Sequence, residues 1–361
     1  KHGIKLVLGY TVEGFKEKDN GVEVLLKDNP SLQADMVVLA IGVTPDTVLA
    51  KEAGLELGIK ESIVVNDRME TSVPDIYAAG DAVQVKHYVT GNDALISLAG
   101  PANKQGRIIA DNICGGDSRY LGSQGSSVIK VFDMTAATTG INETNAKKSG
   151  LEVDTVILSP MSHAGYYPGG KVMTMKVVFE KETYRLLGAQ IIGYEGVDKR
   201  IDVLATAIHA GLNATQLKDL DLAYAPPYSS AKDPVNMAGF MIDNIAKGTL
   251  KQWHLEDMDK ISKDKDVVLL DVRTVGEFSR GHIDGFKNIP VDELRERISE
   301  IEKGKPVYLI CQSGLRSYIA SRILEGNGYE TYNFSGGFRF YDAVVNDRAL
   351  IERTYACGMD Y

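Results

Sequence analysis

One cysteine stands where an apolar strand should end and a helix should begin. Val307–Ile310 favours a buried strand, and Ile319, Ile323 and Leu324 recur at helical spacing. A strand that passes through a short loop into a helix is the unit from which parallel α/β domains are built. Cys311 lies in that loop, where backbone N–H groups converge and the helix N-terminus adds about half a positive charge. We therefore expect a stabilised thiolate whose sulfur is nucleophilic near neutral pH.

The rest of the loop supports a chemical role for this cysteine. Gly314 permits a tight backbone turn and Arg316 supplies a cation, and together they fit a cradle for an anion. The alternative is that Cys311 is a small buried apolar residue, which is the usual fate of a free cysteine. The anion cradle makes that alternative the weaker one. The predicted substrate loop comprises Gln312, Ser313, Gly314 and Leu315.

Four short motifs precede this loop: Asp271-Val272-Arg273, Glu277-Phe278, Gly281-His282-Ile283 and Asn288-Ile289-Pro290. With the loop they resemble the rhodanese domain (sulfurtransferase) family over roughly residues 255–345. Four residues separate Cys311 from Arg316, which matches the sulfurtransferases; the related phosphatases have a longer loop. The resemblance implies that Cys311 carries a persulfide sulfur. We expect His282 to be structural and Asp271 and Arg273 to form a structural ion pair.

Composition excludes several classes of protein. The 361 residues allow two or three domains, and the net charge of −9 argues against nucleic acid or an anionic membrane as the main partner. No apolar run reaches the ~20 residues that a membrane span needs. Three separated cysteines, Cys114, Cys311 and Cys357, suit a reducing cytoplasm and leave no CxxC pair or zinc cluster. Because the chain starts at Lys1 and not at Met, we expect it to be a fragment.

Apolar patterns outline the earlier part of the chain. We expect strands at residues 22–26, 36–41 (buried, and stopped by Gly42) and 63–65, a helix from about residue 100, a hairpin of 172–179 with 186–192, and helices over 201–208 and 234–245. Residues 247–252 are the best candidate for a linker.

The run Ile76–Asp81 ends a strand at a turn of small residues and presents one carboxylate. Gly80 permits a close approach of the backbone to a ligand, and Asp81 can accept hydrogen bonds from sugar hydroxyls. From these residues alone, a solvated turn aspartate is as well supported as a ligand-binding one. With residues 40–46, however, the pattern is similar to the pyridine-nucleotide-disulfide oxidoreductase family. The resemblance implies that Asp81 contacts the ribityl chain of FAD.

The same resemblance gives a role to the helix that starts at Gly100, Pro101 and Ala102. Its N-terminus would point at the pyrimidine edge of the flavin. Proline suits the first turn of a helix, where its missing N–H costs nothing.

Two further segments, 163–170 and 223–234, resemble the dimerisation domain of coenzyme A-disulfide reductases. A rhodanese domain behind that domain resembles the fused subgroup also called NADH-dependent persulfide reductases. The resemblance implies a homodimer through residues 125–247, with two tyrosines reaching the partner subunit's active site. Tyr166 and Tyr224 are the candidates, and Tyr228 is the nearest rival. Interface packing is the alternative role, because tyrosine is common at interfaces.

Other parts of the family pattern are missing from the chain. No G-x-G-x-x-G follows any strand, and no cysteine matches the one that the reductases carry beside the flavin. We therefore predict a multidomain fold with partial Rossmann-like segments, an α+β dimerisation domain and a C-terminal α/β domain with a parallel sheet. The predicted parts are the tail of an NAD-binding domain at 1–47, the second segment of an FAD-binding domain at 48–124, a dimerisation domain at 125–247, a linker at 248–254 and a rhodanese domain at 255–361.

The resemblance implies a cytoplasmic reductase that passes electrons from NAD(P)H through FAD to a cysteine. Its substrate would be coenzyme A disulfide, coenzyme A persulfide or polysulfide, and Cys311 would deliver or accept sulfane sulfur. A stand-alone sulfurtransferase on a dimerisation module, without redox chemistry, is the main alternative. An interaction protein with both sites inactive is a third, against which the intact Cys311 loop counts.

Overall fold

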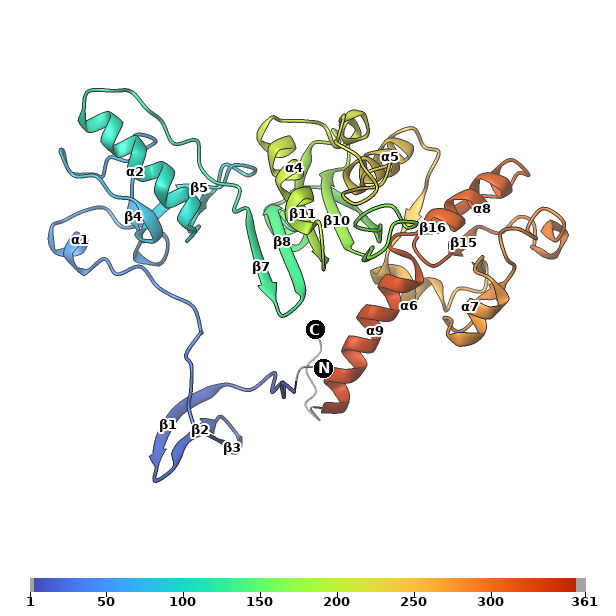
Figure 1. Cartoon of the computed structure of the whole chain (residues 1–361), viewed down its shortest axis with the longest axis horizontal. Coiled ribbons are helices and arrows are strands. Elements are labelled where there is room, and N and C mark those ends of the chain that lie inside the picture. Colours follow the sequence, from blue (N-terminus) through green and yellow to red (C-terminus); the bar gives the residue numbers. More distant parts are fainter. Residues whose placement is uncertain (1–2, 355–361) are drawn as a thin grey trace. The chain divides into compact units, whose positions relative to one another are not determined.

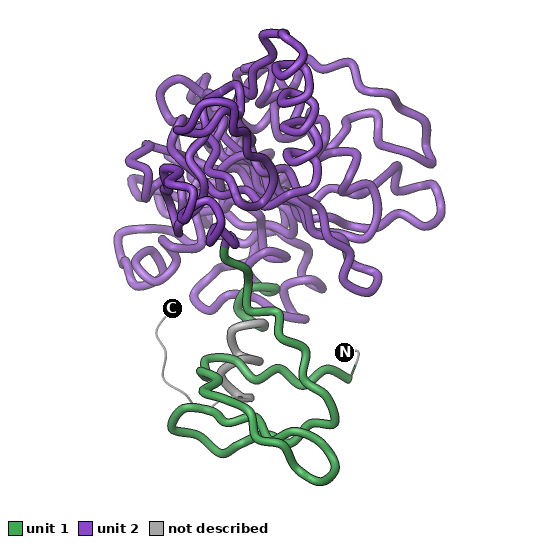
Figure 2. The backbone as a smooth tube through the Cα atoms, turned by 90° about the vertical axis from the view of Figure 1, so that its left-hand side faces the viewer, with its two compact units in different colours: residues 1–44, 342–361 green, residues 45–341 purple. Residues whose placement is uncertain are grey.

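The computed structural model describes the backbone of residues 3–354 and the side chains of residues 3–346. The chain divides into two compact units, one formed by residues 1–44 and 342–361 and the other by residues 45–341 (Figure 2). Figure 1 labels the helices and strands.

The first unit contains a three-stranded antiparallel sheet. Its strands are β1 (Val12–Lys18), β2 (Gly21–Leu26) and β3 (Asn29–Ala34), joined in that order by tight turns. The predicted buried strand at 36–41 is wrong, because Met36 is 75% exposed, Ile41 is 89% exposed, and no strand is assigned there. An apolar run becomes a buried strand only beside neighbours that supply backbone partners, and residues 36–41 pair with none of the strands described.

The second unit begins with a small sheet and one long helix. Strand β4 (Ile63–Val64) pairs in parallel with β5 (Val83–Lys86), and β6 (Asp93–Ala94) pairs with β5 in the opposite sense. Helix α2 (Ala99–Ile113) packs against this sheet, and Met69 and Val83 are buried between them; α1 (Val48–Glu52) is a short helix at the start of the unit. The predicted helix start near residue 100 is confirmed.

The middle of the chain forms an antiparallel sheet covered by helices. Its strands, in the order β7-β8-β11-β10-β9, are β7 (Ser127–Val131), β8 (Met134–Gly140), β11 (Leu186–Gly193), β10 (Thr174–Glu180) and β9 (Val153–Leu158). The predicted hairpin is the β10–β11 pair. Helix α4 (Val197–His209) packs on β8 and β11, α5 (Pro234–Ala246) packs beside β9, and α3 (Glu143–Lys148) adjoins the end of β9. The α+β class predicted for this region is confirmed.

The C-terminal sheet is parallel throughout, as predicted. Its order is β12-β16-β15-β13-β14, with β12 (Gln252–Trp253), β16 (Thr331–Phe334), β15 (Val307–Ile310), β13 (Val268–Asp271) and β14 (Lys287–Asn288). The helices around it are α6 (Met258–Ile261), α7 (Val275–Arg280), α8 (Leu315–Glu325) and α9 (Gly337–Thr354). Separate apolar clusters around Leu309 and around Ile310 bury the sheet on both faces, as a parallel sheet requires.

The linker prediction is wrong at residues 252–253, which form the edge strand β12 of this sheet. The sequence did not predict this strand because polar residues precede it and Trp253 is its only buried side chain. The ring centroid of Trp253 lies 4.6 Å from that of Phe334. Phe286 is buried and stacks on Trp253 with a centroid distance of 6.4 Å.

The C-terminal domain also covers the edge strand β9 of the middle sheet. Ser335 Oγ accepts a hydrogen bond from the Ile157 backbone N–H at 3.0 Å, and Gln252 Nε2 donates to the Thr155 carbonyl at 2.7 Å. His254 Nε2 lies 3.0 Å from Asp154 Oδ1. The outer edge of β9 is therefore occupied by side chains of the next domain.

The opposite edge of the middle sheet is apolar and open. On the β7–β8 hairpin Val128, Ile129, Val131 and Met134 are all exposed, in a region where we predict a homodimer interface. An apolar edge of this kind is typical of a surface that a second subunit covers.

If this edge is the interface, Ile129→Glu should weaken self-association at least tenfold, because a charge would be buried at a cost of ~1.4 kcal/mol or more. Sedimentation equilibrium at micromolar concentration measures the effect. Leu121→Glu is the matched control, since Leu121 is 68% exposed and lies outside the predicted interface. A monomeric wild-type chain, or an equal effect of both substitutions, would contradict the prediction.

Candidate active sites

The Cys311 side chain is buried at the junction of β15 and α8, with its sulfur facing hydrogen-bond donors. The backbone N–H of Gly314 donates to Sγ at 3.1 Å and the Ser317 hydroxyl donates at 3.2 Å. Gly314 has φ +100°, a conformation that favours glycine. Cys311 itself is only 1% exposed, so the two donors replace water around the sulfur. This arrangement can stabilise negative charge on Sγ.

The start of α9 holds the loop from behind. The Phe338 backbone N–H donates to the Cys311 carbonyl at 2.8 Å. Gly337 approaches so closely that a Cβ there would lie 2.7 Å from the Ser313 nitrogen, so no side chain fits. Of the other predicted loop residues, Gln312 is half-buried and Leu315 is exposed at the rim. The structure thus brings the predicted substrate loop together around one sulfur atom.

Arg316 is engaged by a carboxylate that lies 39 residues earlier in the chain. Its two terminal nitrogens each donate to an oxygen of Glu277 at 2.7 Å. This guanidinium holds the pKa of Glu277 at about 2, below its usual range. The pKa of Arg316 is raised, chiefly by Glu277, and the charge of Cys311 contributes. Arg316 therefore lies within electrostatic reach of the sulfur while Glu277 fixes its direction.

Sequence reasoning named Glu277 only as part of a motif and missed Ser317. Glu277 could have been noticed, because Thr274 and Glu277 have the spacing of a helix capping box, and the structure forms one. Ser317 lies one turn along α8 from the loop, and its hydroxyl reaches back to Sγ. The predicted ion pair of Asp271 and Arg273 is present and buried, at 2.7 Å. His282 is exposed and stacks on Phe278, with 4.0 Å between centroids.

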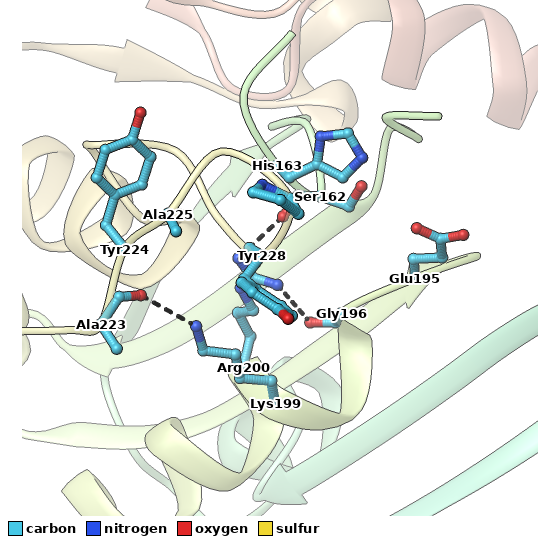
Figure 3. A pocket seen from close by; sticks show the side chains of 11 residues that line it. Ser162, His163, Glu195, Gly196, Lys199, Arg200, Ala223, Tyr224, Ala225 and Tyr228 are labelled. Carbon is cyan, nitrogen blue, oxygen red and sulfur yellow. Dashed lines mark hydrogen bonds between the residues drawn. The ribbon is translucent and has the colours of Figure 1, made fainter. Parts of the chain in front are cut away.

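The two predicted tyrosines meet in space although 58 residues separate them in sequence. The Tyr166 and Tyr224 hydroxyl oxygens lie 2.8 Å apart, and both side chains are exposed. The hydrogen bond between the two hydroxyls raises the pKa of Tyr224. Tyr224 and the rival candidate Tyr228 line a cavity of about 460 Å³, together with Ser162, His163, Lys199 and others (Figure 3).

The residues predicted to contact FAD also lie together. The Gly80 backbone N–H donates to Gln105 Oε1 of α2 at 2.7 Å, which fixes the turn of Gly80 and Asp81 against that helix. Gly80 has φ +82°, and a Cβ there would lie 3.9 Å from Ala102. Leu98 precedes the helix without capping it, so no side chain of the N-cap residue engages the amides beside Gly100 and Pro101.

The remaining sequence predictions concern cysteines, metals and membranes. Cys114 is exposed, and Cys357 lies outside the described residues. Among the side chains that the structure describes, those of residues 3–346, no group of three or more His, Cys, Asp or Glu could hold a metal ion. In the same part of the chain, no helix has both the length and the apolar character needed to cross a membrane.

Comparison with known families gives three matches along the chain. Residues 1–106 match "Pyridine nucleotide-disulphide oxidoreductase", residues 126–234 match the dimerisation domain of that family, and residues 254–343 match "Rhodanese-like domain". The chain belongs to the pyridine nucleotide-disulphide oxidoreductase family and carries a rhodanese-like domain. Both resemblances seen in the sequence are thereby confirmed.

Named relatives match part of this chain. The "NAD(P)H sulfur oxidoreductase (CoA-dependent)" of Pyrococcus abyssi is 37% identical over 235 residues, which are 65% of this chain and 52% of that protein. A "Coenzyme A disulfide reductase" of Staphylococcus aureus is 35% identical over 222 residues, or 61% of this chain and 50% of that protein. The chain spans about half the length of the curated relatives it matches.

Two solved structures superpose on most of this chain. Reduced Bacillus anthracis CoADR-RHD superposes with a TM-score of 0.90 at 46% identity, covering 94% of this chain and 60% of that chain. An NAD-dependent persulfide reductase from A. fulgidus superposes with a TM-score of 0.82 at 40% identity, covering 92% of this chain and 61% of that chain. The predicted fold class is confirmed.

The Glu277–Arg316 pair should make the C-terminal domain acid-sensitive. Because the pKa of Glu277 is lowered from 4.5 to about 2, its stabilisation is present above pH 4.5 and is lost as the pH falls toward 2. Glu277→Gln should reduce the free energy of unfolding by about 1–2 kcal/mol at pH 7, since solvent screens this partly exposed pair.

Urea unfolding followed by the fluorescence of Trp253, the only tryptophan, measures this difference. The difference should shrink by more than half between pH 5 and pH 3. Glu302→Gln is the control, because its ion pair with Lys305 involves a carboxylate side chain that is 63% exposed. A pH-independent difference would refute the assignment.

Proposed function

We propose that this chain is part of a flavin-dependent NAD(P)H:coenzyme A-disulfide or coenzyme A-persulfide (polysulfide) reductase, coupled to a rhodanese sulfurtransferase. The observation that carries the proposal is the buried sulfur of Cys311 with two donors turned toward it, in a chain of the disulphide oxidoreductase family. The names of the relatives support the substrate class, since they refer to coenzyme A, sulfur and persulfide.

In the sulfurtransferase step, the Cys311 thiolate attacks the outer sulfur of a donor. With thiosulfate, the new bond joins Sγ to the sulfane sulfur while the bond to the sulfonyl sulfur breaks, and sulfite leaves with the bonding electron pair. Negative charge moves onto the terminal sulfur of the persulfide. The Gly314 N–H and the Ser317 hydroxyl hold the charge on Sγ before the attack. Arg316, directed by Glu277, attracts the anionic donor.

The reductase role needs a flavin, and the residues present fit one portion of it. FAD, when bound, relays electrons from NAD(P)H to a thiol or persulfide centre. Asp81 is exposed at a glycine turn, where it can accept hydrogen bonds from ribityl hydroxyls. At the helix start, the Gly100 N–H and the positive dipole end can face the pyrimidine edge, whereas Pro101 has no N–H and the Ala102 N–H donates to the Leu98 carbonyl at 3.2 Å.

The tyrosine pair and the open sheet edge support a homodimer through residues 125–247. In such a dimer Tyr166 and Tyr224 of one subunit would reach the reactive centre of the other and hydrogen-bond a thiol or persulfide substrate. The net charge of −9 favours small-molecule substrates over nucleic acid or an anionic membrane surface. We infer a cytoplasmic protein, because three separated cysteines suit a reducing compartment better than a disulfide framework.

The alternative function is a stand-alone sulfurtransferase on a dimerisation module. The Cys311 loop favours it equally, because everything that surrounds the sulfur belongs to the C-terminal domain. Bound flavin in the purified protein would distinguish the reductase from this alternative.

Cys311→Ser should abolish the formation of thiocyanate from thiosulfate and cyanide, because of the two cysteines that the structure describes only Cys311 has the two donors of this loop. Cys114→Ser is the matched control and should retain at least half of the wild-type rate, since Cys114 is exposed at the end of α2. Cys357→Ser should also leave the rate largely intact. Appreciable activity in the Cys311 variant would refute the role of this residue.

The chain of residues 1–361 should retain FAD weakly and should not turn over NADH. Its flavin contacts are limited to the Asp81 turn and the α2 start, and it contains no glycine-rich turn to bind the pyrophosphate. Flavin absorbance after purification and NADH oxidation with coenzyme A disulfide test this. Sulfurtransfer should persist in the same preparation, and stoichiometric flavin with turnover would contradict the prediction.

A further inference from the structure

An arginine is buried beneath the tyrosine-lined cavity. Arg200 lies in the first turns of α4 and is only 1% exposed, although it also contributes to the cavity wall. Its charge partner is Asp233, 3.0 Å away and 3% exposed. Burying an ion pair is costly unless hydrogen bonds satisfy it, so the contacts of this guanidinium indicate what it is used for.

One terminal nitrogen of Arg200 serves several acceptors. Nη2 lies 3.0 Å from the Ser162 carbonyl, 3.0 Å from Asp233 Oδ2, 3.1 Å from Ser229 Oγ and 3.4 Å from the Tyr228 carbonyl. Its two hydrogens are thus shared among acceptors from different segments. The second terminal nitrogen donates to the Gly196 carbonyl at 3.2 Å.

The acceptors of Nη2 lie on the two loops that carry the tyrosine pair. Ser162 begins the loop that carries Tyr166, and Tyr228 and Ser229 follow Tyr224 in the other loop. The loops are also joined directly, because the Ala164 backbone N–H donates to the Ser229 carbonyl at 2.9 Å. The guanidinium therefore connects α4 to both loops at one point (Figure 3).

The residues around the Arg200 guanidinium favour an arginine at this position. A Cβ on Gly196 would lie 2.1 Å from Nη1, and Gly196 also has φ +69°. Asp233 is fixed independently as the N-cap of α5, since its Oδ1 accepts from the Val235 N–H at 3.0 Å. A lysine would keep the charge but could not reproduce the planar set of donors.

We propose that Arg200 is a positioning residue for the Tyr166–Tyr224 hydroxyl pair, acting through the loops that it fastens together. It touches neither hydroxyl. The use of the pair in reduction rests on the proposed function, whereas the positioning itself can be tested in the present chain without flavin or turnover.

The experiment measures the rate at which tetranitromethane, which attacks the phenolate, nitrates Tyr224 between pH 7 and 11. Peptide mass spectrometry gives this rate for each tyrosine separately. In the wild type, ionisation of Tyr224 would break any hydrogen bond that its O–H donates to Tyr166, so the midpoint pH of its nitration profile should lie above the ordinary value of ~10. Tyr166→Phe removes that partner and gives the midpoint of an unpaired Tyr224.

Two variants release the loops in different ways. Arg200→Lys keeps a charge beside Asp233, and the double variant Arg200→Met with Asp233→Leu leaves no unpaired buried charge. Both should move the midpoint for Tyr224 toward that of Tyr166→Phe, so that nitration at pH 9 becomes at least about threefold faster for a shift of half a unit. Lys199→Met is the matched control and should behave as the wild type, because Lys199 makes only a 3.4 Å contact with the Ala223 carbonyl.

Sulfurtransfer at Cys311 and the circular dichroism spectrum should stay within experimental error of the wild type and show that each variant is folded. The proposal is overturned if Tyr166→Phe changes the Tyr224 profile while Arg200→Lys and the double variant leave it unchanged. Should the double variant fail to fold, Arg200→Lys alone decides. Loss of reductase activity in a longer protein would bear on the proposed function and not on this result.

Discussion

A buried sulfur can carry negative charge only if hydrogen-bond donors take the place of water, and the C-terminal domain places two donors at Cys311. The donors at Cys311 are a backbone N–H and a hydroxyl, and both depend on the path of one short loop. The path requires a glycine at 314, and it leaves room behind the loop only for the bare backbone of Gly337. The start of α9 then fixes the loop through the Cys311 carbonyl. The reactive atom is thus positioned by backbone contacts far more than by neighbouring side chains.

The chain uses one device twice to hold loops beneath its candidate sites. In the C-terminal domain Arg273 forms an ion pair with Asp271 and also donates to the Gly281 carbonyl at 2.8 Å. In the middle domain Arg200 pairs with Asp233 and donates to loop carbonyls. In each case the carboxylate lowers the cost of burying the cation, and the same guanidinium also donates to carbonyls of irregular backbone, although Arg200 Nε has no partner. Irregular loops can then be as well defined as the elements that they join.

Local patterns in the sequence were enough to predict the features that depend on near neighbours. The strand, loop and helix around Cys311 are contiguous, and the start of α2 depends on residues that adjoin it. Features that depend on distant partners could not be derived in this way. Glu277 and Arg316 lie 39 residues apart, so their pairing required the fold, and the tyrosine pair was predicted only through family resemblance. The run at 36–41 has the composition of a buried strand, yet its burial would depend on neighbours that the composition does not reveal. The sequence did not predict strand β12 because Trp253 is its only buried side chain and one apolar residue forms no pattern.

The contacts along β9 make the C-terminal domain more than an added module. An edge strand presents unpaired N–H and C=O groups that can recruit a strand from another chain, and proteins usually protect such edges. Here Ser335 Oγ accepts a hydrogen bond from the Ile157 N–H, and Gln252 Nε2 donates one to the Thr155 carbonyl, so a neighbouring domain shields the edge. Removing the rhodanese-like domain would therefore also uncover a template for aggregation along β9. The contact between the two domains thus protects an edge strand independently of any sulfur chemistry, and a shortened chain would need polar or proline substitutions along β9 to compensate for the loss.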